Sequence, residues 1–296
     1  MVSYSVQHLP IKTIVQKHDE WTFPRLSYKI RTRELNDPLI AVFAREGNNM
    51  VGLLLAEHII EQNGIKLISL LVKAENRKKG VGASLLGKIE EWASEKGFWK
   101  MDLVYQSSWE CSQVLIRILT KCHWEDPVRR MIMYYANIKN YEAAPWLSYD
   151  QIPAEFEIFN WSDLTGEDKY FIMNQRVEGS VTPDVDPFQA AEKCLSELSV
   201  GLRHQGQPVG WIITHKVSNE TLQRTCAYLD PEFRKNNLAL ALSASVIKLQ
   251  LKSDYPKAIF QIHTGKQKMI SYFEKFLKEY QDKIVDIFWS TKNLRK

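Results

Sequence analysis

The feature that most constrains the fold is a correspondence between the two halves of the chain. Arg234 lies 157 residues after Arg77, and the same offset brings the apolar segment 101–105 onto 258–262. It also brings the helix expected after Gly82 onto a helix expected in the second half. One offset that aligns a turn, a helix and a strand predicts an internal repeat; chance agreement of two generic α/β segments is the alternative. The 296 residues suit two domains of about 150 residues each.

The first half alternates apolar strands with helices. Hydrophobic spacing predicts helices within 11–34, after Gly82 and over 111–121, and Gly97 is expected to end the second of them. Glu46-Gly47-Asn48-Asn49 is typical of a hairpin turn. Apolar runs predict strands at 4–9, 39–45, 50–60, 65–72, 101–105 and 131–136. The order is a meander of antiparallel strands, a glycine turn into a helix, then strand, helix and strand, which favours an α+β sheet with helices on both faces.

The same pattern starts again beyond residues 141–153, which contain two prolines and which we interpret as a linker. Helices are expected after Ala239 and over 269–280, and strands at 195–204, 208–217, 224–229 and 258–262. We therefore predict two domains, 1–140 and 154–296, each a mixed, mainly antiparallel sheet flanked by helices.

Composition argues against several classes of protein. The formal net charge is +4, and Lys and Arg do not gather into a long basic tract, so we expect no nucleic-acid partner. The four cysteines at 111, 122, 194 and 226 match neither a zinc site nor a disulfide framework, so we expect free thiols and no metal. The N-terminus lacks the apolar core of a signal peptide, and no stretch approaches the roughly 18 apolar residues of a membrane span. We expect a cytoplasmic protein that has no membrane partner.

The chemistry is expected at the turn where Arg77-x-x-Gly80-x-Gly82 opens a helix. The first N–H groups of a helix have no intrahelical partners, and the helix dipole adds partial positive charge there. Gly80 and Gly82 allow a tight backbone, and Arg77, Lys78 and Lys79 add charge. Such a turn suits a pyrophosphate; a purely structural turn is the alternative. Its place after a strand reached by hairpins argues against a dinucleotide-binding βαβ unit, and the ATP-loop pattern G-x-x-x-x-G-K-[ST] is missing.

The segment 72–83, VKAENRKKGVGA, resembles the acetyl-CoA signature of the GNAT superfamily of N-acetyltransferases, R/Q-x-x-G-x-G/A after a strand. The order of elements over 2–137 is similar to that family as well. The resemblance implies that the fourth and fifth strands splay apart and that the pantetheine of acetyl-CoA, or of another short acyl-CoA, lies between them. It implies backbone contacts to the pantetheine from Leu70, Leu71 and Val72. It also implies pyrophosphate contacts from Arg77, Lys78, Lys79, Gly80, Val81, Gly82 and Ala83, and a far side lined by Gln106, Ser107 and Ser108.

The second copy of the signature, 229–239, departs from the first. Asn237 replaces the first glycine, while Ala239 is a tolerated second one. Asn reaches left-handed backbone angles more easily than most residues, but its side chain would crowd a phosphate. We therefore predict a degenerate second copy that binds no cofactor.

The reaction that the resemblance implies is direct attack of a primary amine on the thioester in a ternary complex, with a small molecule as the amine. The family's usual helpers are missing, because the strand 65–72 carries no Glu and Leu119 stands where a Tyr is often found. Glu57, His58 and Tyr105 are the substitute candidates for acid–base catalysis, and the first two point to opposite faces of a strand. Surface, packing and capping roles are the alternatives for these residues.

Two other functions stay open: a protein or peptide N-acetyltransferase, and a non-catalytic acyl-CoA-binding or scaffold protein. Monomer and homodimer stay open too.

Overall fold

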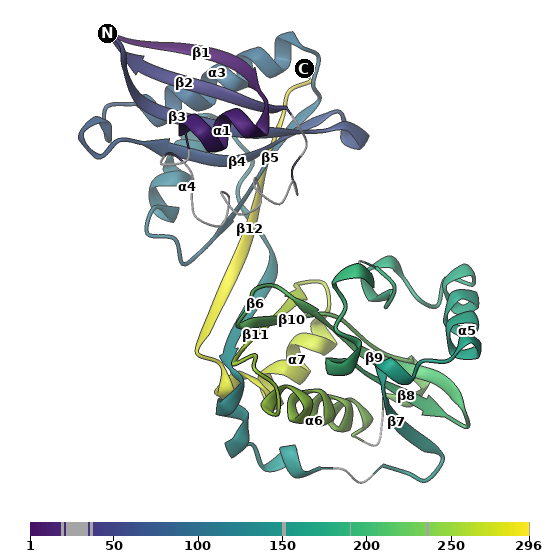
Figure 1. Ribbon diagram of the computed structural model, residues 1–296. Coiled ribbons are helices and arrows are strands. Elements are labelled where there is room, and N and C mark those ends of the chain that lie inside the picture. The colour runs from purple at the N-terminus through teal and green to yellow at the C-terminus, as the bar shows by residue number, and fades with distance from the viewer. Residues whose placement is uncertain are drawn as a thin grey trace. The chain divides into compact units, whose positions relative to one another are not determined.

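The computed structural model describes residues 1–18, 21, 35, 38–149, 152–189, 191–234 and 237–295. The chain forms two compact units (Figure 1). Unit 1 consists of Met1–Arg130 and Asp286–Lys296, and unit 2 of Met131–Val285.

Unit 1 is a mixed sheet with helices on both faces. Its strands follow the order β1-β2-β3-β4-β5-β12, and only the pair β4–β5 is parallel among those described. The elements that begin in this unit are β1 (Val2–Leu9), α1 (Ile11–His18), β2 (Leu39–Glu46), β3 (Asn49–Ile59), β4 (Gly64–Val72), α3 (Val81–Glu95), β5 (Lys100–Gln106) and α4 (Ser112–Lys121). The second helix expected within 11–34 falls on residues outside the described ranges.

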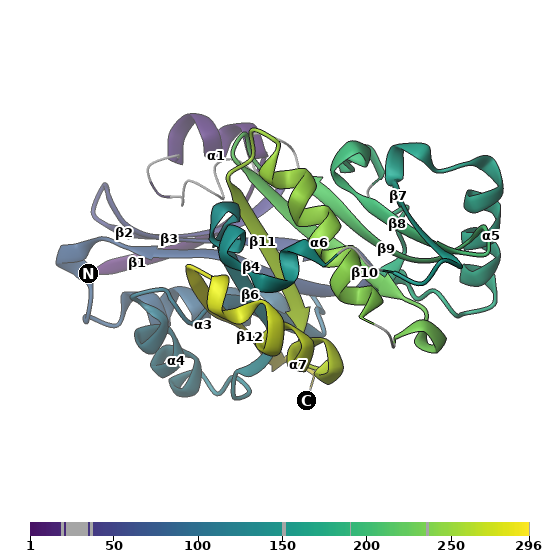
Figure 2. The same cartoon turned by 90° about the horizontal axis from the view of Figure 1, so that it is seen from below.

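The two faces of this sheet have separate cores. Ile11 and Ile14 of α1 pack with Phe43 and Leu53 on one face. The helices α3 and α4 cover the other face, and Figure 2 shows them on the side opposite α1. Gly97 has φ +79° and follows the end of α3, as the sequence predicts.

Unit 2 repeats this plan. Its strands follow the order β6-β11-β10-β9-β8-β7, and β10–β11 is the parallel pair. The helices α6 and α7 cover one face, and α5 packs near the other. The remaining elements are β6 (Val128–Asn137), β7 (Phe156–Asn160), α5 (Gly166–Val177), β8 (Val200–His204), β9 (Gln207–Lys216), β10 (Thr221–Leu229), α6 (Leu238–Leu251), β11 (Lys257–His263), α7 (Gln267–Phe276) and β12 (Lys283–Asn293).

The internal repeat is confirmed residue by residue. An offset of 157 brings β4 and β5 onto β10 and β11, and the first residue of α3 onto that of α6. Ile68 is an extra residue in β4 and Thr225 is its counterpart in β10, so both strands carry a bulge at the same place. Gly80 and Asn237 precede the equivalent helices, and both have left-handed backbone angles.

The last strand of each sheet comes from the other end of the chain. Segment 131–136, expected as the final strand of the first half, forms within β6 but pairs with β11, from Met131↔His263 to Asn137↔Lys257. The place beside β5 is taken by β12. The units are therefore discontinuous, whereas the expected domains 1–140 and 154–296 are continuous. Hydrophobic alternation identifies a strand but not its partner, because either strand offers one apolar face.

Three further details differ from expectation. The strand expected at 195–204 begins at Val200, because Ser196–Leu198 forms a 3-10 turn. The helix expected at 269–280 ends at Phe276. Tyr141, inside the expected linker, is fully buried in the core of unit 2.

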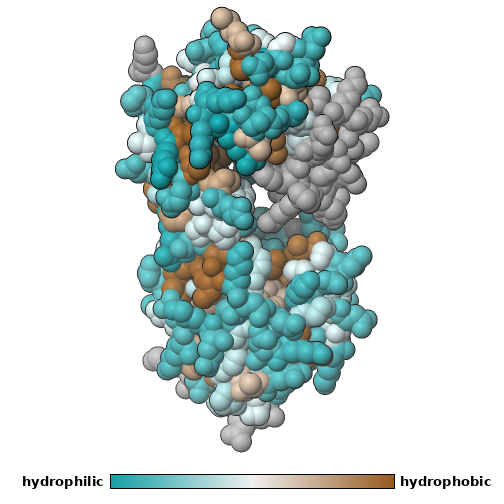
Figure 3. Space-filling view, turned by 90° about the vertical axis from the view of Figure 1, so that its left-hand side faces the viewer, coloured by the Kyte–Doolittle hydropathy of each residue, from teal (hydrophilic) through white to brown (hydrophobic). Residues whose placement is uncertain are grey.

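Most of the visible surface is hydrophilic, with smaller apolar areas between (Figure 3). Scattered apolar side chains are normal at a protein surface. None of the helices in the described ranges is long and apolar enough to cross a membrane.

Candidate functional site

The strands β4 and β5 part in the middle of their length. Their parallel pairing runs from Gly64↔Lys100 to Leu67↔Leu103 and ends there. Beyond this point β4 stays paired with β3 as far as Val72, and β5 stays paired with β12. In the described part of unit 1, the β5-facing edge of β4 over 68–72 therefore has no strand partner. This confirms the splay that the resemblance implies, and it leaves backbone donors and acceptors available to an extended ligand.

The turn after β4 leads into α3, whose N-terminus has no side-chain cap. Gly80 is the N-cap of α3, has φ +83°, and no described side chain bonds to the first turn of the helix. A Cβ at Gly80 would meet nothing within 4 Å, so the space above the turn is open. A Cβ added at Gly82 would lie 3.3 Å from Ile118 Cδ1, so a side chain there would be tightly packed. The free N–H groups and the exposed Lys78 and Lys79 make this turn suitable for a phosphate.

Arg77 ties the turn to the end of the strand. Its Nε donates a hydrogen bond to the Val72 carbonyl at 3.1 Å. In unit 2, Arg234 Nε makes the equivalent bond to the Leu229 carbonyl at 2.9 Å. The arginine of the signature thus shapes the backbone in both units, in addition to adding charge. The bond also engages one of the backbone groups that the resemblance assigns to the pantetheine, although a carbonyl keeps a second lone pair.

Glu57 lies on the α1 face of the sheet. Its side chain is buried, with 8% exposed, and its cross-strand partner is Lys66. Lys66 in turn is paired with Asp102, whose Oδ1 accepts a hydrogen bond from Thr291 Oγ1 at 2.8 Å. Directly paired residues point to the same face. These four side chains therefore form a polar row across β3, β4, β5 and β12.

His58 and Tyr105 lie on the opposite face. The His58 ring makes an edge contact with Phe98 at a centroid distance of 4.9 Å. Tyr105 is 2% exposed and stacks on Phe288 at 5.5 Å, and burial raises the pKa of its phenol. The structure thus separates Glu57 from the other two candidates, as expected for Glu57 and His58.

A pocket of about 270 Å³ adjoins Tyr105 on this face. Ser107, one of its lining residues, is fixed by two hydrogen bonds to β12: the Ser107 N–H donates to the Asp286 carbonyl at 2.9 Å, and the Ser107 Oγ accepts from the Asp286 N–H at 3.1 Å. The pocket is lined by Tyr105, Ser107, Ser112, Gln113, Ile116, Pro127 and Phe288. Phe288 is not among the site residues predicted from the sequence, although the largely apolar run at 284–289 could have indicated a further strand.

Leu119, which stands where the family often has a tyrosine, is a core residue at 1% exposed. No hydroxyl is therefore supplied from that position of α4. A phenol near this end of β5 comes instead from Tyr105.

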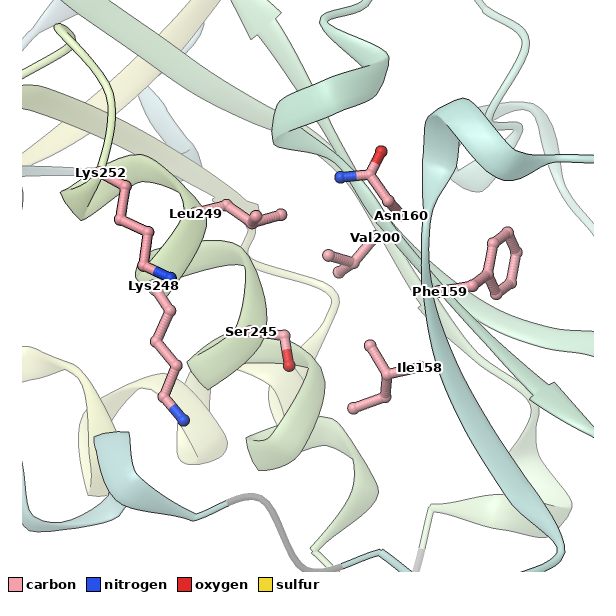
Figure 4. A pocket seen from close by; sticks show the side chains of 8 residues that line it. All are labelled: Ile158, Phe159, Asn160, Val200, Ser245, Lys248, Leu249 and Lys252. Atoms are coloured by element: carbon pink, nitrogen blue, oxygen red, sulfur yellow. The ribbon is translucent and has the colours of Figure 1, made fainter.

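Unit 2 carries the same turn with different chemistry. Asn237 has φ +57° and precedes α6, which has no side-chain cap among the described residues. A pocket of about 250 Å³ lies toward the other end of α6 (Figure 4). In that view Leu249 and Ser245 face Val200 and Ile158 across the hollow, which Phe159, Asn160, Lys248 and Lys252 complete. None of the lining residues belongs to the turn before α6, so this pocket does not indicate a phosphate-binding site at that turn.

Comparison with known proteins supports the resemblance. Residues 9–108 match the acetyltransferase (GNAT) family. No curated protein matches the chain.

Several solved structures share the fold over the full length. A tandem GNAT protein from the clavulanic acid biosynthesis pathway aligns with a TM-score of 0.67 at 13% identity, covering 99% of both chains. A GCN5-related N-acetyltransferase from Sphaerobacter thermophilus gives 0.65 at 13% identity, covering 99% of this chain and 96% of that one. A glucosamine N-acetyltransferase region of a fungal multi-domain β-N-acetylglucosaminidase gives 0.65 at 12% identity, covering 99% of this chain and 38% of that one.

The sheet order, the parted strands and the glycine turn agree with these matches. The chain therefore has a tandem GNAT fold, and residues 9–108 in its N-terminal half match the acetyltransferase (GNAT) family.

Proposed function

We propose that unit 1 is an acyl-CoA-dependent N-acyltransferase that moves an acetyl or short acyl group to the primary amine of a small molecule. The observation that carries this proposal is the position of two features at the same end of β4. The strand loses its β5 partner after Leu67, and the uncapped N-terminus of α3 begins at Val81, shortly after Arg77, which is hydrogen-bonded to the Val72 carbonyl at the end of the strand. A linear ligand with a pyrophosphate matches both.

The residues present fit acyl-CoA. The open space at Gly80 and the free N–H groups of Val81, Gly82 and Ala83 suit the pyrophosphate. The exposed side chains of Lys78 and Lys79 add charge. The unpaired edge of β4, including Leu70 and Leu71, suits the amide groups of the pantetheine. Gln106, Ser107 and Ser108 are at the corresponding end of β5.

The chemistry needs a base, an oxyanion donor and an acid, because acyl-CoA supplies only the activated thioester. We assign the base to Glu57, whose carboxylate belongs to the polar row and is screened from bulk water by burial. A backbone N–H on the free edge of β4 donates to the thioester carbonyl. Tyr105 donates a proton to the departing sulfur, since burial keeps its phenol protonated at neutral pH. A ligand between parted strands is accessible from both faces, which reconciles the opposite orientations of Glu57 and Tyr105.

A small amine is the acceptor class that we favour. The glucosamine N-acetyltransferase region of similar fold acts, by its description, on an amino sugar. The first acceptors to examine are therefore glucosamine, other amino sugars, polyamines and amino acids, with lysine-containing peptides as the protein-directed alternative.

The test is release of CoA thiol from acetyl-CoA in the presence of each amine, with Glu57→Gln as the matched inactive variant. We expect turnover with at least one small amine and little with peptides. Acetyl-CoA binding without turnover on any amine would contradict the enzyme and support a non-catalytic acyl-CoA-binding protein. Faster turnover on peptides would contradict the small-molecule acceptor.

A further inference from the structure

Unit 2 buries an arginine whose guanidinium has no hydrogen-bond partner among the described residues. Arg224 on β10 is 5% exposed, and its Nε, Nη1 and Nη2 are all buried without a hydrogen-bond partner in the described part of the chain. No carboxylate of the described residues lies within ion-pair distance of it. A guanidinium stays charged in proteins, and an unpaired buried charge is strongly unfavourable. Native proteins rarely keep such a group unless something binds to it.

The repeat shows that this arginine is not required by the fold. The equivalent residue of unit 1 is Leu67, which belongs to the apolar core there. Both residues are the last of their strand to pair with the neighbouring parallel strand, as Leu67↔Leu103 and Arg224↔Phe260. Leucine at this position is therefore compatible with the same sheet. The Arg224 guanidinium of unit 2 is therefore a polar group that the fold does not require.

A second unpartnered polar group lies beside the first. Thr214 on β9 is the cross-strand partner of Arg224, so the two side chains share a face. Thr214 is fully buried, and its Oγ1 has no hydrogen-bond partner among the described residues. A guanidinium fork and a hydroxyl on one face are the donors that bind an oxyanion.

The surroundings select the kind of oxyanion. The guanidinium carbon lies 5.1 Å from the centre of the Phe260 ring, and Phe260 contacts Phe273 and Tyr141 at centroid distances of 5.2 and 6.5 Å. Tyr141 is the titratable neighbour that acts on Arg224, and burial raises the pKa of its phenol, so it stays neutral. The Arg224 guanidinium carries a single positive charge and is surrounded by aromatic rings. It therefore suits a ligand with a single negative charge whose remaining atoms are apolar. A phosphate dianion would leave an excess charge buried.

A ligand would reach Arg224 along the edge of β10 that is no longer paired with β11. Past Arg224 the described residues of these two strands no longer pair. In unit 1 the same edge is the one we assign to acyl-CoA. A ligand that enters there in unit 2 meets the guanidinium at the point where the strands separate.

We propose that unit 2 holds a second ligand site, in which Arg224, with Thr214 beside it, binds the carboxylate of a monoanion that has an aromatic or alkyl body. This site is independent of the acyltransfer proposed for unit 1. It gives the second copy a role other than that of a degenerate acetyl-CoA domain.

Isothermal titration calorimetry on the full chain tests the proposal with benzoate and hexanoate as probes and with acetate and inorganic phosphate as comparison anions. We expect benzoate or hexanoate to bind with one site per chain. Arg224→Leu, which installs the residue of unit 1, should weaken that binding about 100-fold through loss of two charge-assisted hydrogen bonds. Arg224→Lys should give a smaller loss, because an ammonium keeps the charge without the fork. The control Arg176→Met changes an arginine of unit 2 that is 58% exposed, and it should bind like the parent.

Three results would overturn the proposal: neither probe binds the unmodified chain, Arg224→Leu binds them equally well, or phosphate binds as tightly as they do. Crystals of the unmodified chain soaked with 4-bromobenzoate give a readout that does not depend on the folding of any variant. The bromine anomalous peak should lie beside Phe260 in unit 2. A peak elsewhere, or none, contradicts the site.

Discussion

Arg77 Nε donates to the carbonyl of Val72, five residues earlier in the chain, across 3.1 Å. The bond joins the last residue of β4 to the glycine turn that opens α3, so the strand edge and this turn are held in one fixed arrangement. A charged donor to a carbonyl is one of the stronger kinds of hydrogen bond. The same bond between Arg234 and Leu229 in unit 2 indicates that it belongs to the fold itself.

Arg77→Ala is expected to weaken acetyl-CoA binding about 10-fold, because it removes both a positive charge and the bond that positions the turn. Calorimetric titration of acetyl-CoA measures this. Arg234→Ala removes the equivalent bond from unit 2 and should leave the affinity unchanged. Equal weakening by both variants would contradict the assignment of the cofactor to unit 1.

Glu57→Gln is expected to lower kcat about 100-fold with the acetyl-CoA affinity unchanged, because it removes the base but keeps the shape of the side chain. Steady-state CoA release and calorimetry measure the two quantities. His58→Asn is the neighbouring control, since His58 lies on the opposite face against Phe98. A larger loss of kcat in His58→Asn than in Glu57→Gln would contradict this assignment and indicate that the imidazole is the base.

Phe288→Ala is expected to destabilise unit 1 by about 3 kcal/mol through loss of a partly buried aromatic side chain. Phe288 stacks on Tyr105, although it lies far along the chain from every other strand of that sheet. Hydrogen exchange should show faster exchange in β4 and β5, with β8 and β9 unaffected. Faster exchange confined to unit 2 would contradict the assignment of β12 to the first sheet.

The Asp168 carboxylate of unit 2 should make stability depend on acid pH. Burial alone would raise its pKa, but hydrogen bonds from Arg203 and Thr165 outweigh burial, so the pKa is lowered. Arg203 Nη2 and Nε lie 2.7 and 3.2 Å from its two oxygens. Because the folded pKa lies below the unfolded one, the stabilisation is present above the unfolded pKa and is lost as pH falls through the folded pKa.

Asp168→Asn should therefore cost about 3 kcal/mol at pH 7 and progressively less as the pH falls below the unfolded pKa of about 4, measured by guanidinium unfolding. Glu157→Gln is the control, because Glu157 also pairs with Arg203 but is 65% exposed and should cost under about 1 kcal/mol. A cost of Asp168→Asn that did not change with pH would show that the carboxylate acts through packing alone.

Much of the fold could be predicted from local patterns. The glycine turn, the hairpin at 46–49 and the 157-residue offset each depend on neighbours in sequence, and each is present in the structure. The exchange of β6 and β12 could not be predicted, since a strand's alternation does not specify its partner. The short strand Phe156–Asn160 and the helix Gly166–Val177 were missed as well. Thr165 and Asp168 form a capping box there, a local signal that could have identified the helix.

The site was only partly predictable for the same reason. The residues of the glycine turn are contiguous, so the sequence places them together. The Tyr105 pocket depends on Pro127 and Phe288, which come near only through the path of the chain. The burial of Arg224 could not be read from its position in a strand, because an arginine there ordinarily reaches water.

The most direct test is a titration of acetyl-CoA into the unmodified chain, Gly80→Asp and Asn237→Asp, with folding checked by circular dichroism. Gly80 has φ +83° beside the uncapped helix, so a carboxylate there both strains the backbone and repels a phosphate. We predict that Gly80→Asp binds at least about 100-fold more weakly, while Asn237→Asp binds like the unmodified chain. Equal affinities for all three folded proteins, or loss in Asn237→Asp alone, would contradict the location of the acyl-CoA site.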